Sequence, residues 1–208
     1  MRAARQPQRG VTRLLEIFKQ TAALLARRMP GLRLVVPIAE TVRDLLVPAL
    51  RDWPAAPVPV FGEAAKLDAM AASNVALAAS GTVALELALA RVPAVVAYRL
   101  ALPSYLLIKR LVKVRHVHLL NILAEQAIVP ERLQGACRPD LLAADLEPLF
   151  GSAGAAQIRA LVPPLAALRP PADGAPSDHA AREISKFLIA RSDPARAVDP
   201  GYSPARQA

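Results

Sequence analysis

Apolar positions alternate along the first half of the chain between two spacings. Short runs rich in branched residues, typical of buried strands, lie at 32–38, 58–61, 74–79 and 93–98. The stretches between and before them repeat their apolar side chains at helical spacing, at 12–28, 40–50, 63–72 and 82–90. Helices that alternate with buried strands in this way predict an α/β fold, a Rossmann-like parallel sheet with helices on both faces.

The pattern changes beyond Tyr98, where the predicted elements are mainly helical, at 119–126, 139–150 and 155–168. A Pro-rich linker follows, and Asp178 is a suitable N-cap for a last amphipathic helix. The final residues carry several prolines and few large apolar groups, so we expect them to be disordered. The chain should therefore divide into an atypical basic segment, an α/β domain, a linker, a helix and a tail, at 1–10, 11–168, 169–177, 178–191 and 192–208.

Composition narrows the class of partner and the cellular location. With 54% apolar residues, the 208-residue chain can bury a large core, and its net charge of +9 favours an anionic partner. Aromatic residues make up only 4% and we find no zinc-finger or RNP-type motif, so nucleic acid is not expected. We find neither a transmembrane stretch nor a secretory signal, which predicts a cytoplasmic protein. Cys137 is the only cysteine, which excludes a disulfide within the chain.

Residues 80–86, SGTVALE, carry the strongest candidate chemistry. They follow a predicted strand and open a predicted helix, the place where open parallel sheets bind phosphates. Gly81 lets the backbone approach a ligand, and the hydroxyls of Ser80 and Thr82 can donate to phosphate oxygens. Glu86 lies one helical turn beyond Thr82, where ribose hydroxyls could bind its carboxylate. Ordinary N-capping and a glutamate favoured by the helix dipole account for the same residues equally well.

Two longer blocks add to this motif. Residues 79–99, ASGTVALELALARVPAVVAYR, and 107–134, LIKRLVKVRHVHLLNILAEQAIVPERLQ, together resemble lipid-A-disaccharide synthase, a bacterial glycosyltransferase family of the two-domain GT-B architecture. The likeness includes the Leu-Asn-Ile-Leu run at 120–123 and the Pro-Glu-x-x-Gln at 130–134, and it covers about 11–149. The resemblance implies that the chain is the C-terminal, donor-binding domain of such an enzyme.

The resemblance also implies roles for single residues. Ser80, Gly81 and Thr82 would hold the diphosphate of a UDP-linked acylated glucosamine, and Glu86 would take the ribose. The loop after the second strand would turn its backbone toward the uracil, at Phe61, Gly62 and Glu63.

Four more residues are candidates for the site: three match family positions, and one is placed by its position after a strand. Asn121, Glu131 and Gln134 would lie near the donor sugar and the diphosphate. Without the resemblance, the sequence favours an Asn in a helical cap and a solvated Glu and Gln in a loop. Arg99, just after a strand end, is the candidate helper for the leaving diphosphate, although an arginine there is often a surface ion-pair partner.

The implied reaction transfers 2,3-diacylglucosamine from its UDP donor to a lipid monosaccharide 1-phosphate, with inversion and loss of UDP. No cofactor and no metal are expected, because helix N-termini and arginines can neutralise the leaving diphosphate. His116 and His118 lack a carboxylate or cysteine at ligand spacing, so they make a weak metal motif. The apolar, basic stretch at 105–115 suits a peripheral contact with the cytoplasmic face of the inner membrane, and a core helix suits it equally.

The chain departs from the family pattern at its start. Family members are nearly twice as long, and their N-terminal half carries the acceptor site and the expected catalytic base, so the catalytic residues are expected outside this chain. The residues MRAARQPQRG stand where the family has a strand that ends in a Pro-Gly-Ser-Arg turn, and Arg9 is the candidate remnant of the phosphate-binding arginine of that turn. Two alternatives stay open. One is an epimerase or hydrolase, for which we find no acid and base pair; the other is a non-catalytic binding or assembly module that dimerises through its C-terminal helix.

Overall fold

The computed structural model describes residues 6–79, 81–99, 116–169 and 175–192. Ser80 and the predicted membrane stretch at 105–115 lie outside these residues, as do the first five residues of the basic start. The chain divides into two compact units, Met1–Ala167 and Leu168–Ala208. The second unit contains helix α9, Pro176–Ser192, and the rest of the described elements belong to the first.

Among the described residues, five strands form the centre of the first unit, and each pairs in parallel with its neighbours. Strands β1 (Val35–Ile38) and β2 (Val58–Phe61) pair with each other, while β3 (Ala76–Ala79), β4 (Ala94–Tyr98) and β5 (Glu131–Leu133) make a second sheet in the order β3-β4-β5. The predicted α/β fold with parallel strands is confirmed. Among the described residues, hydrogen bonds join the strands into two separate ladders rather than one. Strand β5 was not predicted, and Glu131 begins this strand instead of lying in a loop.

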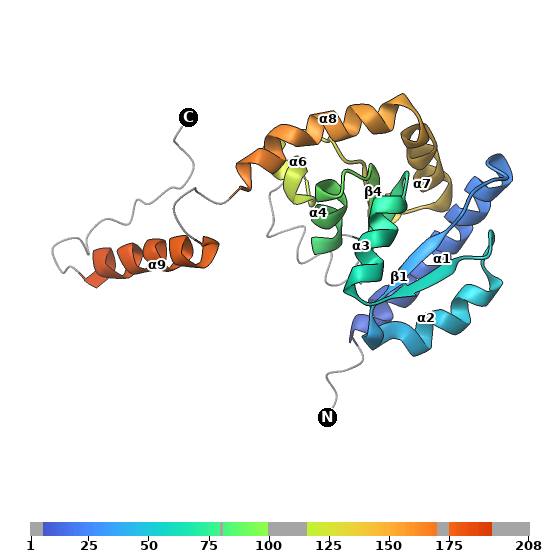
Figure 1. Ribbon diagram of the computed structural model, residues 1–208, viewed down its shortest axis with the longest axis horizontal. Coiled ribbons are helices and arrows are strands. Elements are labelled where there is room, and N and C mark those ends of the chain that lie inside the picture. Colours follow the sequence, from blue (N-terminus) through green and yellow to red (C-terminus); the bar gives the residue numbers. More distant parts are fainter. Residues whose placement is uncertain (1–5, 80, 100–115, 170–174, 193–208) are drawn as a thin grey trace. The chain divides into compact units, whose positions relative to one another are not determined.

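The helices surround these strands. They are α1 (Gln6–Arg28), α2 (Arg43–Ala49), α3 (Glu63–Ala72), α4 (Thr82–Leu89), α6 (Leu119–Ala124), α7 (Pro139–Leu146) and α8 (Ser152–Ala167), with short 3-10 turns η2 (Glu40–Val42), η3 (Leu50–Asp52), η4 (Gln134–Ala136) and η5 (Glu147–Phe150). Helix α1 begins at Gln6, well before the predicted start at Thr12, so the part of the basic segment that includes Arg9 is helical. Figure 1 shows α3 and α4 side by side, with α8 running across the top of the unit.

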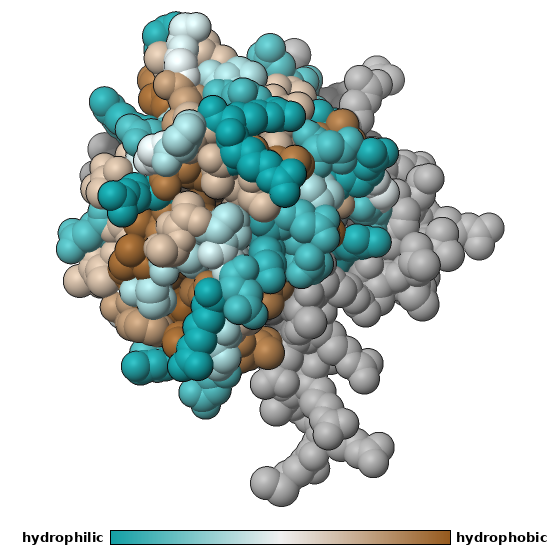
Figure 2. Space-filling view, turned by 90° about the vertical axis from the view of Figure 1, so that its right-hand side faces the viewer, coloured by the Kyte–Doolittle hydropathy of each residue, from teal (hydrophilic) through white to brown (hydrophobic). Residues whose placement is uncertain are grey.

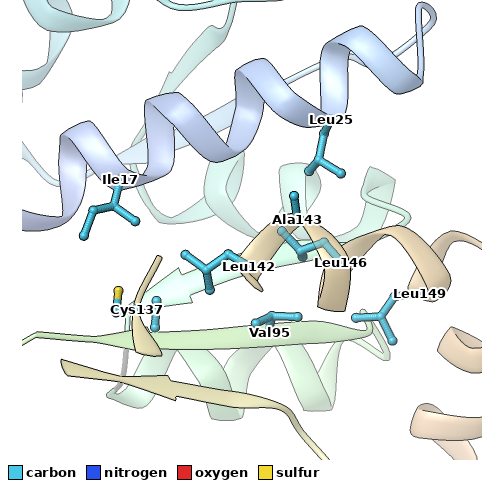
Figure 3. Packing of buried hydrophobic residues seen from close by; sticks show 9 residues of the cluster. Ile17, Leu25, Val95, Cys137, Leu142, Ala143, Leu146 and Leu149 are labelled. Atoms are coloured by element: carbon cyan, nitrogen blue, oxygen red, sulfur yellow. The ribbon is translucent and has the colours of Figure 1, made fainter. Parts of the chain in front are cut away.

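Strand β4 is the most deeply buried strand, because helices cover both of its faces. Successive side chains of a strand point to opposite faces, and those of Val95 and Val96 are fully buried on opposite sides. Val95 packs against α7 and α1, with Leu142 of α7 between Val95 and Ile17 (Figure 3). Val96 packs against α4, α6 and α8, where Leu161 contributes to the same cluster. A strand with no polar face explains its continuous apolar sequence.

The polar residue Gln157 of α8 fixes that helix to the start of β4. Its side-chain amide accepts a hydrogen bond from the Ala94 backbone N–H at 2.7 Å and donates to the Ala94 carbonyl at 3.1 Å. One helical turn earlier, Gly154 lies so close to the Leu149 carbonyl oxygen that an added Cβ would clash with it. The amide pair thus holds α8 to β4, and the close approach holds α8 to η5.

Helix α1 contributes to two clusters and so joins the two sheets. Ile17 and Leu25 pack on α7, while Leu15 packs on the β1-β2 sheet together with Ile38 and Leu46. Figure 2 views the side of the molecule at which α1 and α2 lie in Figure 1, and polar and apolar side chains are interspersed there. Among the described residues, no helix combines the length and the apolar character that crossing a membrane requires.

Candidate functional site

Most of the predicted site residues follow the carboxyl end of a strand. Gly81 comes after β3, Arg99 directly after β4 and Gln134 directly after β5, and these three strands are parallel neighbours. Their carboxyl ends therefore share one edge of the sheet, where ligands of open α/β sheets bind. Gly62 takes the same position after β2 in the other sheet.

Two helix N-termini begin at glycines whose conformation only glycine adopts readily. Gly62, the N-cap of α3, has φ 81° and ψ 162°, and Gly81, the N-cap of α4, has φ 141° and ψ −161°. No side chain caps either helix by a hydrogen bond at this residue. First-turn N–H groups that no side chain occupies are suited to an anion, and the helix dipole adds to their attraction.

Lys66 of α3 connects this helix to α4 through an ion pair. Its Nζ lies 2.7 Å from Oε1 of Glu63 on its own helix and 2.9 Å from Oε2 of Glu86 on α4. These two contacts, first that with Glu63 and then that with Glu86, raise the pKa of Lys66 above its usual value, against a smaller opposing effect of burial. The structure therefore supplies a partner for the carboxylate that stands out on the apolar sequence of α4. It also brings Glu63 and Glu86, predicted from separate segments, to one cation.

Gln134 combines a strained backbone with an unused hydrogen-bond donor. Its φ is +50°, which non-glycine residues seldom adopt, and its side-chain Nε2 is buried without a partner in the described structure. Both features carry a free-energy cost, and such costs concentrate at functional sites. Arg99 is exposed, and its charge opposes the burial that raises the pKa of the nearby Cys137 thiol.

Asn121 is fully buried, and its amide is hydrogen-bonded on all sides. Nδ2 donates to the Val129 carbonyl at 2.8 Å and to Glu131 Oε1 at 3.1 Å, while Oδ1 accepts from the N–H groups of Ile128 and Val129 at 3.0 and 2.9 Å. A primary amide has two donors and one acceptor oxygen with two lone pairs, so its capacity is used within the chain. Asn121 lies inside α6, whose N-cap is His118, so it is not the helical cap that the sequence favours without the family resemblance.

Glu131 is half-buried and holds the start of α6. Its carboxylate accepts hydrogen bonds from the backbone N–H groups of Val117, at 3.0 and 3.1 Å, and of His118. A carboxylate at this end of a helix is favoured by the helix dipole. Glu131 is therefore not the solvated loop residue that the sequence favours without the family resemblance, because tertiary contacts draw its side chain inward.

His118 links α6 to α4. Nδ1 accepts a hydrogen bond from the Leu120 N–H at 3.2 Å, and a second hydrogen bond joins the ring to the Ala84 backbone. Burial lowers the pKa of His118, and the Ala84 bond and the Glu131 charge oppose this effect only in part. The His118 ring thus connects the start of α6 to the first turn of α4. Within the described ranges, no group of three or more histidine, cysteine or acidic side chains is placed to hold a metal ion.

Phe61 and Thr82 occupy different surroundings. Phe61 is half-buried against the β1-β2 cluster, and the guanidinium of Arg43 lies 4.4 Å from its ring centroid. Thr82 is the exposed first residue of α4. The sequence analysis assigned no role to Lys66 and considered His118 only as part of a weak metal motif. The spacing of Lys66 three residues after Glu63 was the available signal for its ion pair with Glu63.

Comparisons with known proteins bear on this arrangement. The family model described as lipid-A-disaccharide synthetase matches residues 3–159, well over half of the chain. The chain belongs to the lipid-A-disaccharide synthetase family.

Named relatives agree with the family match. The chain is 48% identical over 147 residues to a lipid-A-disaccharide synthase of Rhodospirillum centenum, covering 71% of the chain and 37% of the relative. Identity is 47% over 150 residues to that of Paramagnetospirillum magneticum, covering 71% and 38%, and 38% over 188 residues to that of Granulibacter bethesdensis, covering 85% and 48%. The chain thus matches between about a third and a half of the length of these curated relatives.

Proposed function

We propose that this chain is the donor-binding part of a lipid-A-disaccharide synthase. The enzyme would transfer 2,3-diacylglucosamine from UDP-2,3-diacylglucosamine to a lipid monosaccharide 1-phosphate, and this chain would hold the UDP-sugar. The observation that carries the proposal is the pair of helix N-termini at Gly62 and Gly81, joined through Lys66 and Glu86.

In this proposal the diphosphate lies at the N-terminus of α4. Its oxygens accept hydrogen bonds from the N–H groups that follow Gly81 and from the hydroxyl of Thr82, with Ser80 preceding them in sequence. Any other residue at Gly81 would have to adopt a backbone conformation that is essentially restricted to glycine. The positive end of the helix dipole stabilises the charge on the departing UDP, so that no metal ion is required.

The nucleoside lies between the two helices. Glu86 accepts hydrogen bonds from the ribose hydroxyls, and the backbone at Phe61, Gly62 and Glu63 faces the uracil. Glu86 is one third exposed at the side chain, which leaves part of it accessible to a ligand.

The remaining site residues serve the sugar and the diphosphate in two ways. Arg99 and Gln134 contact the donor, and the buried, unpaired Nε2 of Gln134 supports such a contact. Asn121 and Glu131 lie near the donor and act as positioning residues, because their hydrogen-bonding groups are engaged with α6 and β5. The base that activates the acceptor is not assigned to this chain.

Thermal unfolding in the presence of UDP tests the donor site. UDP should raise the melting temperature, by the equivalent of about 2.7 kcal/mol at one hundred times its Kd. Glu86→Ala should abolish the shift. Glu183→Ala, which removes a carboxylate paired with a lysine on α9, should leave it intact. Absence of any shift at millimolar UDP would refute the proposal.

The cellular location of the chain is a second proposal. We propose a cytoplasmic protein whose stretch at 105–115 contacts the inner membrane from the cytoplasmic face, as the basic and apolar composition suggests. Sedimentation with anionic vesicles tests the membrane contact, and recovery of all protein in the supernatant would contradict it.

We also propose a homodimer through the C-terminal helix, in which Ile184 and Ile189 are 60% and 71% exposed. A light-scattering mass of one chain would contradict that.

A further inference from the structure

The ion pairs of Lys66 differ in their exposure to solvent. The Lys66 side chain is 21% exposed and that of Glu86 33%, whereas that of Glu63 is 73% exposed. Water screens exposed ion pairs, so the contact with Glu86 is the better protected of the two. It is also the only one of the two that crosses between helices, because Glu63 and Lys66 are three residues apart on α3.

An ion pair of this kind restricts how Glu86 can move. A glutamate on a helix surface samples several side-chain conformations, and binding a ligand must then fix one of them. Here the ammonium of Lys66 lies 2.9 Å from Oε2 in an ion pair, and Oε2 is buried and has no hydrogen-bond partner in the described structure. The carboxylate is thereby fixed before any ligand arrives, with Oε1 left as the second acceptor.

We propose that Lys66 sets the ribose specificity of the nucleotide site by holding Glu86 in the orientation that accepts the ribose hydroxyls. This inference rests on the proposed function, since it assigns a positioning residue to the same site. Lys66 itself does not contact the ribose. It converts a mobile carboxylate into a fixed acceptor, so that a nucleotide lacking one of the hydroxyls forfeits a hydrogen bond to a charged group.

Calorimetric titration with UDP and with 2′-deoxy-UDP distinguishes a role of Lys66 in ribose specificity from a role that affects the binding of any nucleotide. Both ligands carry the same diphosphate and base. A loss of positive charge or a small change in fold would therefore weaken the binding of both ligands equally, and the ratio of their Kd values would not change. The unaltered chain should prefer UDP by about tenfold, the value of one hydrogen bond to a charged group. Lys66→Met should reduce the preference to within about twofold of unity, and Lys66→Arg, which can still donate to Glu86, should restore most of it.

Two further variants complete the design. Lys66→Gln, a polar replacement without charge, should behave as Lys66→Met does, and it serves if the methionine variant does not fold. Lys186→Met breaks a Lys–Glu pair of the same three-residue spacing on α9, with a contact of 2.8 Å, and should leave the preference unchanged.

The outcomes distinguish the inference from the proposed function. Failure of the unaltered chain to bind UDP at millimolar concentration would overturn both. Binding of UDP without a preference over 2′-deoxy-UDP, or a preference that Lys66→Met and Lys66→Gln retain while both ligands weaken equally, would overturn this inference alone and leave the donor site standing.

Discussion

Truncation of Asn121 is the sharpest test of how the fold supports the site. Asn121→Ala removes all four hydrogen bonds of a side chain with 0% exposure. The backbone groups of Ile128 and Val129 lose their partners, and Glu131 loses one donor. The segment before β5 is then no longer fastened to α6.

The magnitude follows from the number of bonds. At about 1 kcal/mol net for each hydrogen bond, the variant should lose roughly 3–4 kcal/mol of stability. For a unit of this size each kcal/mol corresponds to about 2–4 °C, so the melting temperature should fall by roughly 6–16 °C. Asn121→Asp should be destabilised as well, because a carboxylate would face the Val129 carbonyl and the Glu131 carboxylate.

Urea unfolding followed by circular dichroism gives the free energy and its dependence on denaturant. The matched control is Ile122→Ala, the next residue of α6, whose side chain is 38% exposed and should contribute much less. If Asn121→Ala lowers the free energy of unfolding by less than about 1 kcal/mol, at an unchanged denaturant dependence, the hydrogen bonds of Asn121 do not stabilise the contact between α6 and the segment before β5.

Two other predictions concern packing and pH. Gly154→Ala should cost about 1–3 kcal/mol in urea unfolding although alanine favours helices, because its Cβ would meet the Leu149 carbonyl oxygen; Gly135→Ala, with open space around it, should be close to neutral, and equal effects would contradict this reasoning. Since the folded-state pKa of His118 lies below the ordinary 6.5, the unfolded chain binds the proton more readily, and stability should fall as pH drops below 6.5. His118→Asn, which keeps a capping acceptor, should reduce this slope between about pH 7.5 and 5.5, and an unchanged slope would contradict a lowered pKa of His118 in the folded chain.

Local pattern was sufficient for the elements that have a strong one. The runs at 58–61 and 63–72 became β2 and α3 at the predicted residues, because branched residues and a glycine turn are local signals. Strand β5 escaped prediction because it has three half-buried residues, two of them charged, and pairs only with β4 in the described sheet. The first turns of α1 were not predicted, because Gln6 and its neighbours show no apolar periodicity. They are helical because they extend the helix that the periodic residues form.

The glycine turn before α4 and the carboxylate at Glu86 were visible in the sequence, because both depend on spacing within one short segment. Their partners were not. Lys66 meets Glu86 only because α3 and α4 pack side by side, and Asn121 meets Glu131 only because the chain returns from α6 into β5. Sequence alone determined the α/β class and the strand-to-helix turns, since these rest on local patterns of apolar and glycine positions. It also indicated the family, through the resemblance of two longer blocks. Tertiary structure alone decided which charges are paired and which polar side chains are used up, because a hydrogen bond or ion pair between distant segments depends on how the helices pack.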